Sequence, residues 1–195
     1  MKGDTNLTKE TRKNHGLIML DILKDSEHRV GCEVGVYTGT MVGFLLKELP
    51  RIERYYTVDP WASYKQYDGK KYRRPGHKVV TNWEQAILMY FRNIEPFQHK
   101  VITLRMKSTE GVKHIPDEFL DWVYIDANHK YEYVKENLEI WTPKVKPGGI
   151  VSGHDYDNPK GYGKGWNVKK AVDEFVPKSL LNIEGLVWWF KKPVT

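Results

Sequence analysis

The sequence predicts an α/β protein with a Rossmann-like three-layer sandwich, in which a mainly parallel, seven-stranded sheet carries helices on both faces. Short apolar runs rich in β-branched residues alternate with longer amphipathic stretches, which is the pattern of β-α-β units. The spacing between consecutive runs leaves room for a crossover. The pattern locates six of the strands, at residues 30–34, 55–58, 100–103, 122–125, 150–153 and 186–190.

Helices are expected between and around these strands. Their apolar residues recur at intervals of three and four, which gives one apolar face. A proline follows soon after most of them, where a residue without a backbone N–H ends the hydrogen-bond ladder. The expected helices span residues 9–23, 40–49, 81–94, 131–142 and 167–175.

Length and composition indicate one domain across residues 1–195. The chain is 40% hydrophobic and 13% aromatic, which is enough apolar material for a single core. Residues 1–12 are too polar to pack, and we expect them to be flexible. Residues 60–80 form an unusually long connection after the carboxyl end of a strand, and they are rich in Tyr, Lys and Arg. We interpret this insertion as a lid or a substrate-recognition segment.

The cysteine count and the N-terminus indicate a cellular compartment. The chain has one cysteine, Cys32, inside an apolar run, so no disulfide can form within a monomer. No apolar stretch approaches the ~18 residues that cross a bilayer, and the N-terminus lacks the apolar region of a signal peptide. We therefore expect a cytoplasmic protein without a membrane partner.

The net charge of +6 raises the question of a nucleic-acid partner. Lys and Arg are spread along the chain, and their one dense cluster lies at residues 65–78. This cluster suits a solvated loop, an anionic small molecule or a phosphate backbone. A nucleic acid is therefore kept as the less favoured partner, behind a small molecule.

The strongest local signal is the segment Glu-Val-Gly-Val-Tyr-Thr-Gly at residues 33–39, where a strand turns into a helix. Glycines let the backbone approach a ligand closely, and the following helix N-terminus offers free N–H groups. The Gly-x-x-x-Gly spacing differs from the Gly-x-Gly-x-x-Gly of dinucleotide sites. Glu33 would repel a pyrophosphate but suits a ligand with an ammonium group, such as S-adenosylmethionine. The alternative is that Glu33 caps the turn.

A second acid, Asp59, ends the next predicted strand, 24 residues after Gly35. An acid at about this distance from a glycine turn is placed to accept hydrogen bonds from ribose hydroxyls. The alternative is that Asp59, which precedes Pro60, only starts a turn.

With these residues in place, the chain resembles class I S-adenosylmethionine-dependent methyltransferases. Within that group it is similar to small-molecule O-methyltransferases of the catechol type and the macrocin type. The resemblance covers residues 32–156 and includes the glycine turn, Asp59, Asp126 and the Lys-Pro-Gly-Gly segment at 146–149. It implies that S-adenosylmethionine is the cofactor. The implied cofactor contacts are Glu33, Gly35, Val36, Tyr37, Gly39, Asp59, Pro60, Trp61, Ser108 and Asp126.

The resemblance also implies catalytic and metal-binding residues. In catechol-type enzymes the acids that match Asp126 and Asp155 bind Mg²⁺, and the base lies where this chain has His129. Oxygen ligands suit such a hard cation, which acidifies a substrate hydroxyl. Histidine is also a reasonable base near neutral pH. We therefore expect His129 and Asp126 to be catalytic.

The predicted metal site departs from the family at its third ligand, where Tyr156 replaces an Asn or Asp. His154, Asp157 and His129 are the candidates to complete it, and we name Asp126, Asp155 and His154 as the metal set. In the structural alternative, His129 and His154 only stiffen the cleft by bonding to the acids, and Asp126 caps the following helix.

The sequence thus predicts an enzyme that methylates a hydroxyl of a small molecule, with a divalent cation such as Mg²⁺ as an optional helper. The alternatives are methylation of RNA or another polyanion, and a non-catalytic or hydroxylase-like protein on the same fold. The chain lacks the Asp/Asn-Pro-Pro-Tyr tetrapeptide of many base methyltransferases, which argues against RNA. The aromatic pair at 188–189 and the N-terminal helix offer apolar surface that a homodimer could cover.

Overall fold

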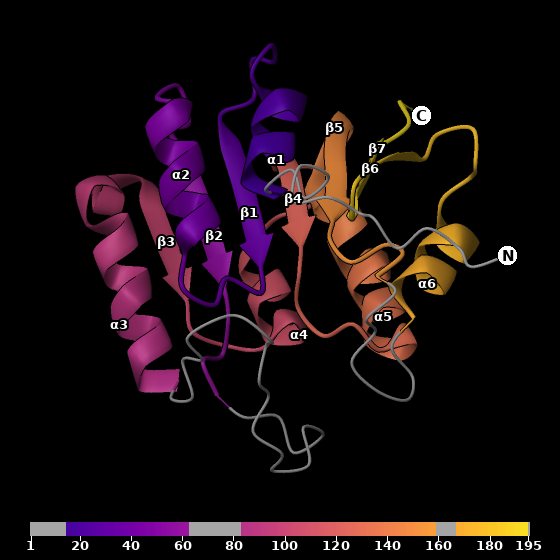
Figure 1. The fold of residues 1–195 in the computed structure, drawn as a ribbon. Helices are drawn as coiled ribbons and strands as arrows, with labels where there is room; N and C mark the ends of the chain where they lie inside the picture. Colours follow the sequence, from indigo (N-terminus) through magenta and orange to yellow (C-terminus); the bar gives the residue numbers. More distant parts are fainter. Residues whose placement is uncertain (1–14, 63–82, 159–166, 195) are drawn as a thin grey trace, which may run out of the picture.

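The computed structural model describes residues 15–62, 83–158 and 167–194. These residues form a seven-stranded sheet in the order β3-β2-β1-β4-β5-β7-β6 (Figure 1). The first five strands are parallel, and β7 runs antiparallel to both β5 and β6. The strands are β1 (Val30–Val34), β2 (Arg54–Val58), β3 (Val101–Leu104), β4 (Leu120–Ile125), β5 (Val145–Gly153), β6 (Asn182–Glu184) and β7 (Val187–Lys191).

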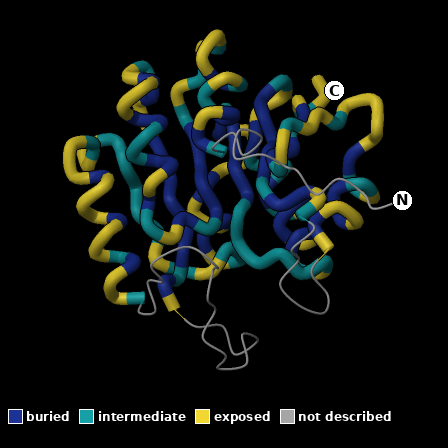
Figure 2. The backbone as a smooth tube through the Cα atoms, in the orientation of Figure 1, coloured by how far each residue is buried: buried dark blue, intermediate teal, exposed yellow. Residues whose placement is uncertain are grey.

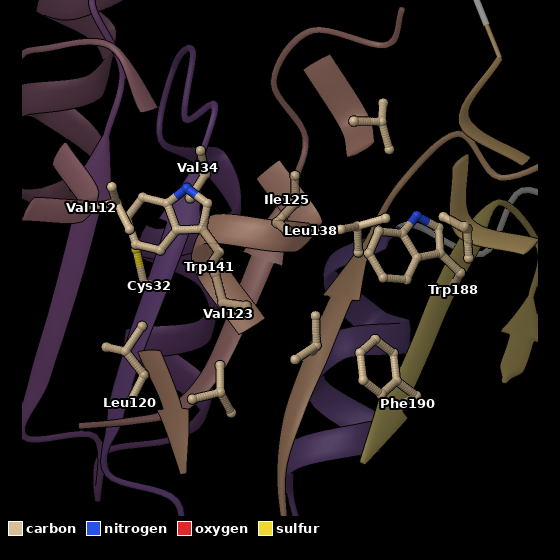
Figure 3. Close-up of a cluster of buried hydrophobic side chains, with 14 of the residues drawn as sticks. Cys32, Val34, Val112, Leu120, Val123, Ile125, Leu138, Trp141, Trp188 and Phe190 are labelled. Atoms are coloured by element: carbon tan, nitrogen blue, oxygen red, sulfur yellow. The ribbon is translucent and has the colours of Figure 1, made fainter. Parts of the chain in front are cut away.

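Helices cover both faces of the sheet and make two hydrophobic cores. On one face, α1 (His15–Leu23), α2 (Thr40–Glu48) and α3 (Trp83–Ile94) pack against the sheet. On the other face lie α4 (Ser108–Gly111), α5 (Tyr131–Trp141) and α6 (Val168–Phe175), in the core drawn in Figure 3. The predicted three-layer α/β sandwich is therefore confirmed. Short 3-10 helices span Glu95–Lys100, Val112–His114 and Thr142–Lys144.

Alternation along the central strand β1 sets which side chains reach which core. Cys32 and Val34 point into the core shared with α5 and α6. Glu33, the residue between them in the sequence, points to the opposite face of the sheet. Gly31 lies under the ring of Trp122, where an added Cβ would overlap the indole. Figure 2 shows the result, with a buried sheet and helices exposed on their outer sides.

The strand predictions hold for six strands and miss one. The missed strand, β6, has three residues, two of them exposed, so it lacks the apolar run on which the prediction depended. Residues 146–149, which we expected before the fifth strand, lie inside β5. The reason is that the N–H of Gly148 donates to the carbonyl of Lys192, and the N–H of Lys192 donates to that of Gly149, each at 2.8 Å.

The helix predictions need small corrections at the ends. Leu49 is the C-cap of α2, Thr142 begins a 3-10 turn after α5, and Asn167 is the N-cap of α6, with its side chain accepting the N–H of Lys170. The expected starts of the first and third helices, at residues 9 and 81, lie outside the described residues. The short helix α4 was not predicted, because four residues show no period.

The parallel strands bring four polar segments to one edge of the sheet. In Figure 1 the arrowheads of β1, β2 and β4 end at this lower edge. Gly35 follows β1, Asp59 follows β2, Asp126 follows β4 and His154 follows β5. Open α/β sheets bind ligands at this edge, next to the point where the strand order reverses. Here that point lies at β1, which pairs with both β2 and β4.

Candidate active site

The loop from β1 to α2 has a backbone that requires glycine. Gly35 has φ 91° and Gly39 has φ 69°, and the non-glycine Tyr37 between them also has a positive φ, 53°. A Cβ on Gly35 would overlap the backbone carbonyl oxygen of Asp126. The predicted glycine turn therefore bends the chain and also lets the backbone after β1 pass very close to the backbone after β4.

Asp59 holds this glycine loop in place. Its Oδ2 accepts the backbone N–H of Val36 at 3.0 Å and that of Tyr37 at 2.9 Å, and its Oδ1 accepts the N–H of Trp61 at 2.7 Å. Burial raises the pKa of Asp59, and the three N–H donors act in the other direction. A carboxylate offers about four acceptor positions. Oδ1 therefore keeps room for one more donor, so the predicted ribose contact stays a prediction beside this structural role.

Trp61 supports the same loop from inside the protein. Its indole N–H donates to the carbonyl of Tyr37 at 2.7 Å, and its ring packs on Tyr90 with 4.8 Å between centroids. The side chain is only 2% exposed, so its main role here is structural. Contacts of Pro60 and Trp61 with a cofactor remain predictions.

Glu33 is a buried acid among other acids. It is 4% exposed, and among the described residues its carboxylate accepts one hydrogen bond, from the hydroxyl of Tyr55 at 3.4 Å. Burial, and then the charge of Asp126, raise the pKa of Glu33 well above its usual value. A buried carboxyl without a cationic partner is costly for the fold. Such a group is typical of a binding site for a cation.

We predict that Glu33→Gln stabilises the protein in a pH-dependent way. Because the folded-state pKa is raised, the folded chain keeps this proton after the unfolded chain has lost it near pH 4.5, so wild-type stability falls as pH rises through that window. The amide that replaces the carboxyl in the variant cannot ionise, so the variant's stability does not fall in this pH range. Urea unfolding at pH 4, 6 and 8 should show a gain for Glu33→Gln that grows with pH. The exposed Glu136→Gln is the control, and an equal response of both variants would contradict the prediction.

Two acids and two histidines meet beside the glycine loop, after β4 and β5. The Nε2 of His129 lies 3.0 Å from Asp126 Oδ1 and 2.9 Å from Asp155 Oδ2, so this nitrogen bridges both carboxylates. The Nδ1 of His154 lies 3.5 Å from the same Asp155 oxygen. The amide of Asn158 donates to the other Asp155 oxygen at 2.6 Å. The structure thus brings together the four predicted residues of this set.

Charge within this cluster fixes its protonation. Burial lowers the pKa of His129, but hydrogen bonds and charges from Asp126 and Asp155 outweigh it and raise the pKa to about 9. Burial acts to raise the pKa of Asp155, yet hydrogen bonds from His129 and His154 hold it far below its usual range. In this arrangement His129 is an imidazolium at neutral pH. It must therefore release its Nε2 proton before that nitrogen can accept one from a substrate.

The residues present also fit a divalent cation. Within the described residues, Asp126, His154 and Asp155 each offer one ligand atom, and these atoms lie within 4.8 Å of one another. Two carboxylates and one imidazole are a donor set for Mn²⁺, Zn²⁺ or Fe²⁺ as well as for Mg²⁺. Of the third ligands that the sequence left open, His154 joins this group.

Tyr156 does not complete this group. Its hydroxyl bonds to Asp173, and Lys169 donates to it at 2.9 Å, so the side chain belongs to a contact with α6. Asp126 does not cap α5 either, because the N-cap of that helix is Lys130, without a side-chain cap hydrogen bond.

Ser108 lies at the start of α4, and its side chain is engaged within the protein. Its hydroxyl bonds to the amide oxygen of Asn137, and the indole of Trp141 donates to it at 2.7 Å. The expected contact with an adenine remains a prediction. The insertion at 60–80, apart from residues 60–62, and the basic cluster at 65–78 lie outside the described residues.

Tyr124 is a residue of this edge that the sequence analysis missed. It pairs in register with Glu33 and is 1% exposed. Strand alternation could have found it, because residues 122, 124 and 126 share a face of β4.

Comparison with known proteins identifies the family. The sequence profile of a methyltransferase domain matches residues 32–156, which include the glycine loop, Asp59 and both acids of the cluster. The chain belongs to this methyltransferase domain family. This confirms the resemblance to class I S-adenosylmethionine-dependent methyltransferases, and the range agrees with the one we expected.

Solved O-methyltransferases share the fold of this methyltransferase domain. TomG from Streptomyces achromogenes, involved in tomaymycin synthesis and solved with S-adenosylmethionine, has a TM-score of 0.63 at 12% identity, over 91% of this chain and 79% of its own. An O-methyltransferase from Bacillus cereus, solved with S-adenosylhomocysteine, has a TM-score of 0.59 at 17% identity, over 92% of this chain and 81% of its own.

A curated relative adds sequence similarity without a function. The uncharacterized protein y4gI from Sinorhizobium fredii is 29% identical over 92 residues, which are 46% of this methyltransferase chain and 10% of y4gI. The chain therefore matches only a small part of that relative's length. No helix in the described ranges is long and apolar enough to cross a membrane.

Proposed function

We propose that this methyltransferase transfers the methyl group of S-adenosylmethionine to a hydroxyl oxygen of a small molecule. The observation that carries the proposal is the convergence of Asp126, His129 and Asp155 beside the glycine loop. Proton acceptors at this position would lie next to the transferred methyl group. The two solved O-methyltransferases described above, one of them named for a role in tomaymycin synthesis, support a small-molecule hydroxyl acceptor.

In this proposal the cofactor lies across the carboxyl ends of β1, β2 and β4. Glu33 supplies negative charge for the ammonium of the methionine part, and Asp59 Oδ1 accepts a ribose hydroxyl. The loop of Gly35, Val36, Tyr37 and Gly39 lets the ligand approach the backbone. Ser108 lies toward the adenine.

The chemical step moves one methyl group and one proton. The acceptor oxygen attacks the methyl carbon, the bond from this carbon to sulfur breaks, and S-adenosylhomocysteine leaves with the electron pair. The acceptor's proton goes to Nε2 of His129 once that nitrogen has released its own proton to solvent, and the Asp126 carboxylate stabilises the imidazolium that forms again. Positioning of the two substrates supplies much of the acceleration. Asp126, Asp155 and His154 would hold a divalent cation, which when bound would acidify the acceptor hydroxyl.

We predict that His129→Gln lowers kcat by about 10²- to 10⁴-fold, because an amide cannot take a proton at working pH. The affinity for S-adenosylhomocysteine, measured by calorimetry, should stay unchanged. Activity is measured as transfer of a labelled methyl group from S-adenosylmethionine to a panel of phenols and sugars. Parallel assays contain EDTA, or Mg²⁺ or Mn²⁺ after its removal. The exposed His114→Gln is the control.

Two results would count against this proposal. Wild-type protein that binds neither S-adenosylmethionine nor S-adenosylhomocysteine would remove the transfer reaction altogether. An unchanged kcat in His129→Gln would remove His129 from the proton path. We also propose that the enzyme is cytoplasmic, which suits the buried free thiol at Cys32, and that it forms a homodimer.

A further inference from the structure

The hydroxyl of Tyr124 is buried without a hydrogen-bond partner among the described residues. The side chain comes from the end of β4, and the residue is 1% exposed. A buried hydroxyl that makes no hydrogen bond destabilises the fold unless a ligand or water satisfies it. Phenylalanine would fill the same space without that cost. The hydroxyl therefore points to a bound partner.

The surroundings of this hydroxyl are negative. Tyr124 lies beside Glu33 in the register of β1 and β4 and two residues before Asp126. Burial, and then the charges of Asp126, Glu33 and Asp155, raise the pKa of Tyr124 well above its usual value. His129 bridges Asp126 and Asp155, but in the described part of the chain the hydrogen bond to Glu33 comes from neutral Tyr55. The surroundings of the Tyr124 hydroxyl and the Glu33 carboxyl thus favour a cation that can donate hydrogen bonds.

The ring of Tyr124 stacks on a histidine of the first helix. His15, at the start of α1, stacks on it at 6.3 Å between centroids, and the edge of His15 meets His154 at 5.1 Å. The register of β1 and β4 places Tyr124 directly beside Glu33. These contacts fix the hydroxyl at the edge of the sheet, between the glycine loop and the acid–histidine cluster.

We infer that the Tyr124 hydroxyl and the Glu33 carboxylate together bind the α-ammonium group of the methionine part of the cofactor. An ammonium has three N–H donors and needs more than one acceptor. Glu33 provides charge, and Tyr124 provides a second acceptor with fixed direction. This inference rests on the proposed function and adds a binding residue to it.

The test compares two ligands that differ only in this ammonium group. S-adenosylhomocysteine and its desamino analogue, which keeps the carboxylate and the adenosine, are titrated by calorimetry into wild type and Tyr124→Phe. We expect the Kd of S-adenosylhomocysteine to rise at least about 10-fold in the variant, as for loss of a hydrogen bond to a charged group. The Kd of the desamino analogue should not change. The unfolding temperature without ligand should equal or exceed that of wild type.

Tyr90→Phe is the matched control. The hydroxyl of Tyr90 is also buried, but it bonds to Thr57 at 2.7 Å and to Thr103 at 2.6 Å. Its loss should lower the unfolding temperature and leave the ratio of the two dissociation constants unchanged. Equal weakening of both ligands in Tyr124→Phe, or of neither, would overturn the inference and leave the proposed function intact. Wild type that fails to bind S-adenosylhomocysteine would overturn both.

Discussion

Gly35→Ala is expected to abolish binding of S-adenosylhomocysteine and to lower the free energy of unfolding by roughly 2–5 kcal/mol. Two costs add. The φ of 91° is strained for any residue with a Cβ, and this Cβ would also overlap the carbonyl oxygen of Asp126. Because that oxygen belongs to the backbone after β4, relief of the overlap would separate β1 and β4 at the edge where the cofactor is proposed to bind. Urea unfolding and calorimetry measure the two effects.

Gly148→Ala is the control for backbone strain alone. Gly148 also has a positive φ, 77°, but an added Cβ would meet no atom within 4 Å. Its replacement should cost only about 1–2 kcal/mol and leave ligand binding unchanged. If the two variants lost the same stability and both still bound the ligand, the close approach of Gly35 to Asp126 would not matter for the site.

Much of the fold could be predicted because its signals are local. Alternating apolar runs located the six longer strands, and strand ends placed Glu33, Asp59, Asp126 and Asp155 at one edge of a parallel sheet. β6 escaped because a three-residue exposed strand has no apolar pattern. It forms only because β7 offers a partner edge.

The details of the site depend on contacts between distant residues, which one sequence does not reveal. The residue spacing suggested a ribose acceptor at Asp59, but not that its carboxylate also fixes the backbone of Val36, Tyr37 and Trp61. Likewise, the sequence left open both a base and a structural role for His129. The structure explains why the two roles are hard to separate. The Nε2 of His129 holds Asp126 and Asp155 together, and the same nitrogen would act as the base.

Asp59→Ala should lower stability and ligand affinity together. The change leaves three backbone N–H groups, of Val36, Tyr37 and Trp61, without their acceptor, at about 1–3 kcal/mol each when buried. The burial cost of the carboxylate, visible in its raised pKa, offsets part of this loss. We therefore expect a net loss of about 3 kcal/mol in urea unfolding. The affinity for S-adenosylhomocysteine should fall about 100-fold or more, because the variant loses both the shape of the glycine loop and the proposed ribose acceptor.

Asp121→Ala separates loss of stability from loss of the site. Asp121 Oδ2 also accepts two backbone N–H groups, of Arg29 at 2.7 Å and Val30 at 2.8 Å, but at the amino end of β1, the opposite edge of the sheet. Its removal should destabilise the protein and leave the affinity for S-adenosylhomocysteine unchanged. If both variants weakened binding equally, the effect of Asp59 would be one of general stability. If neither did, the ligand would lie elsewhere than on the loop that Asp59 holds.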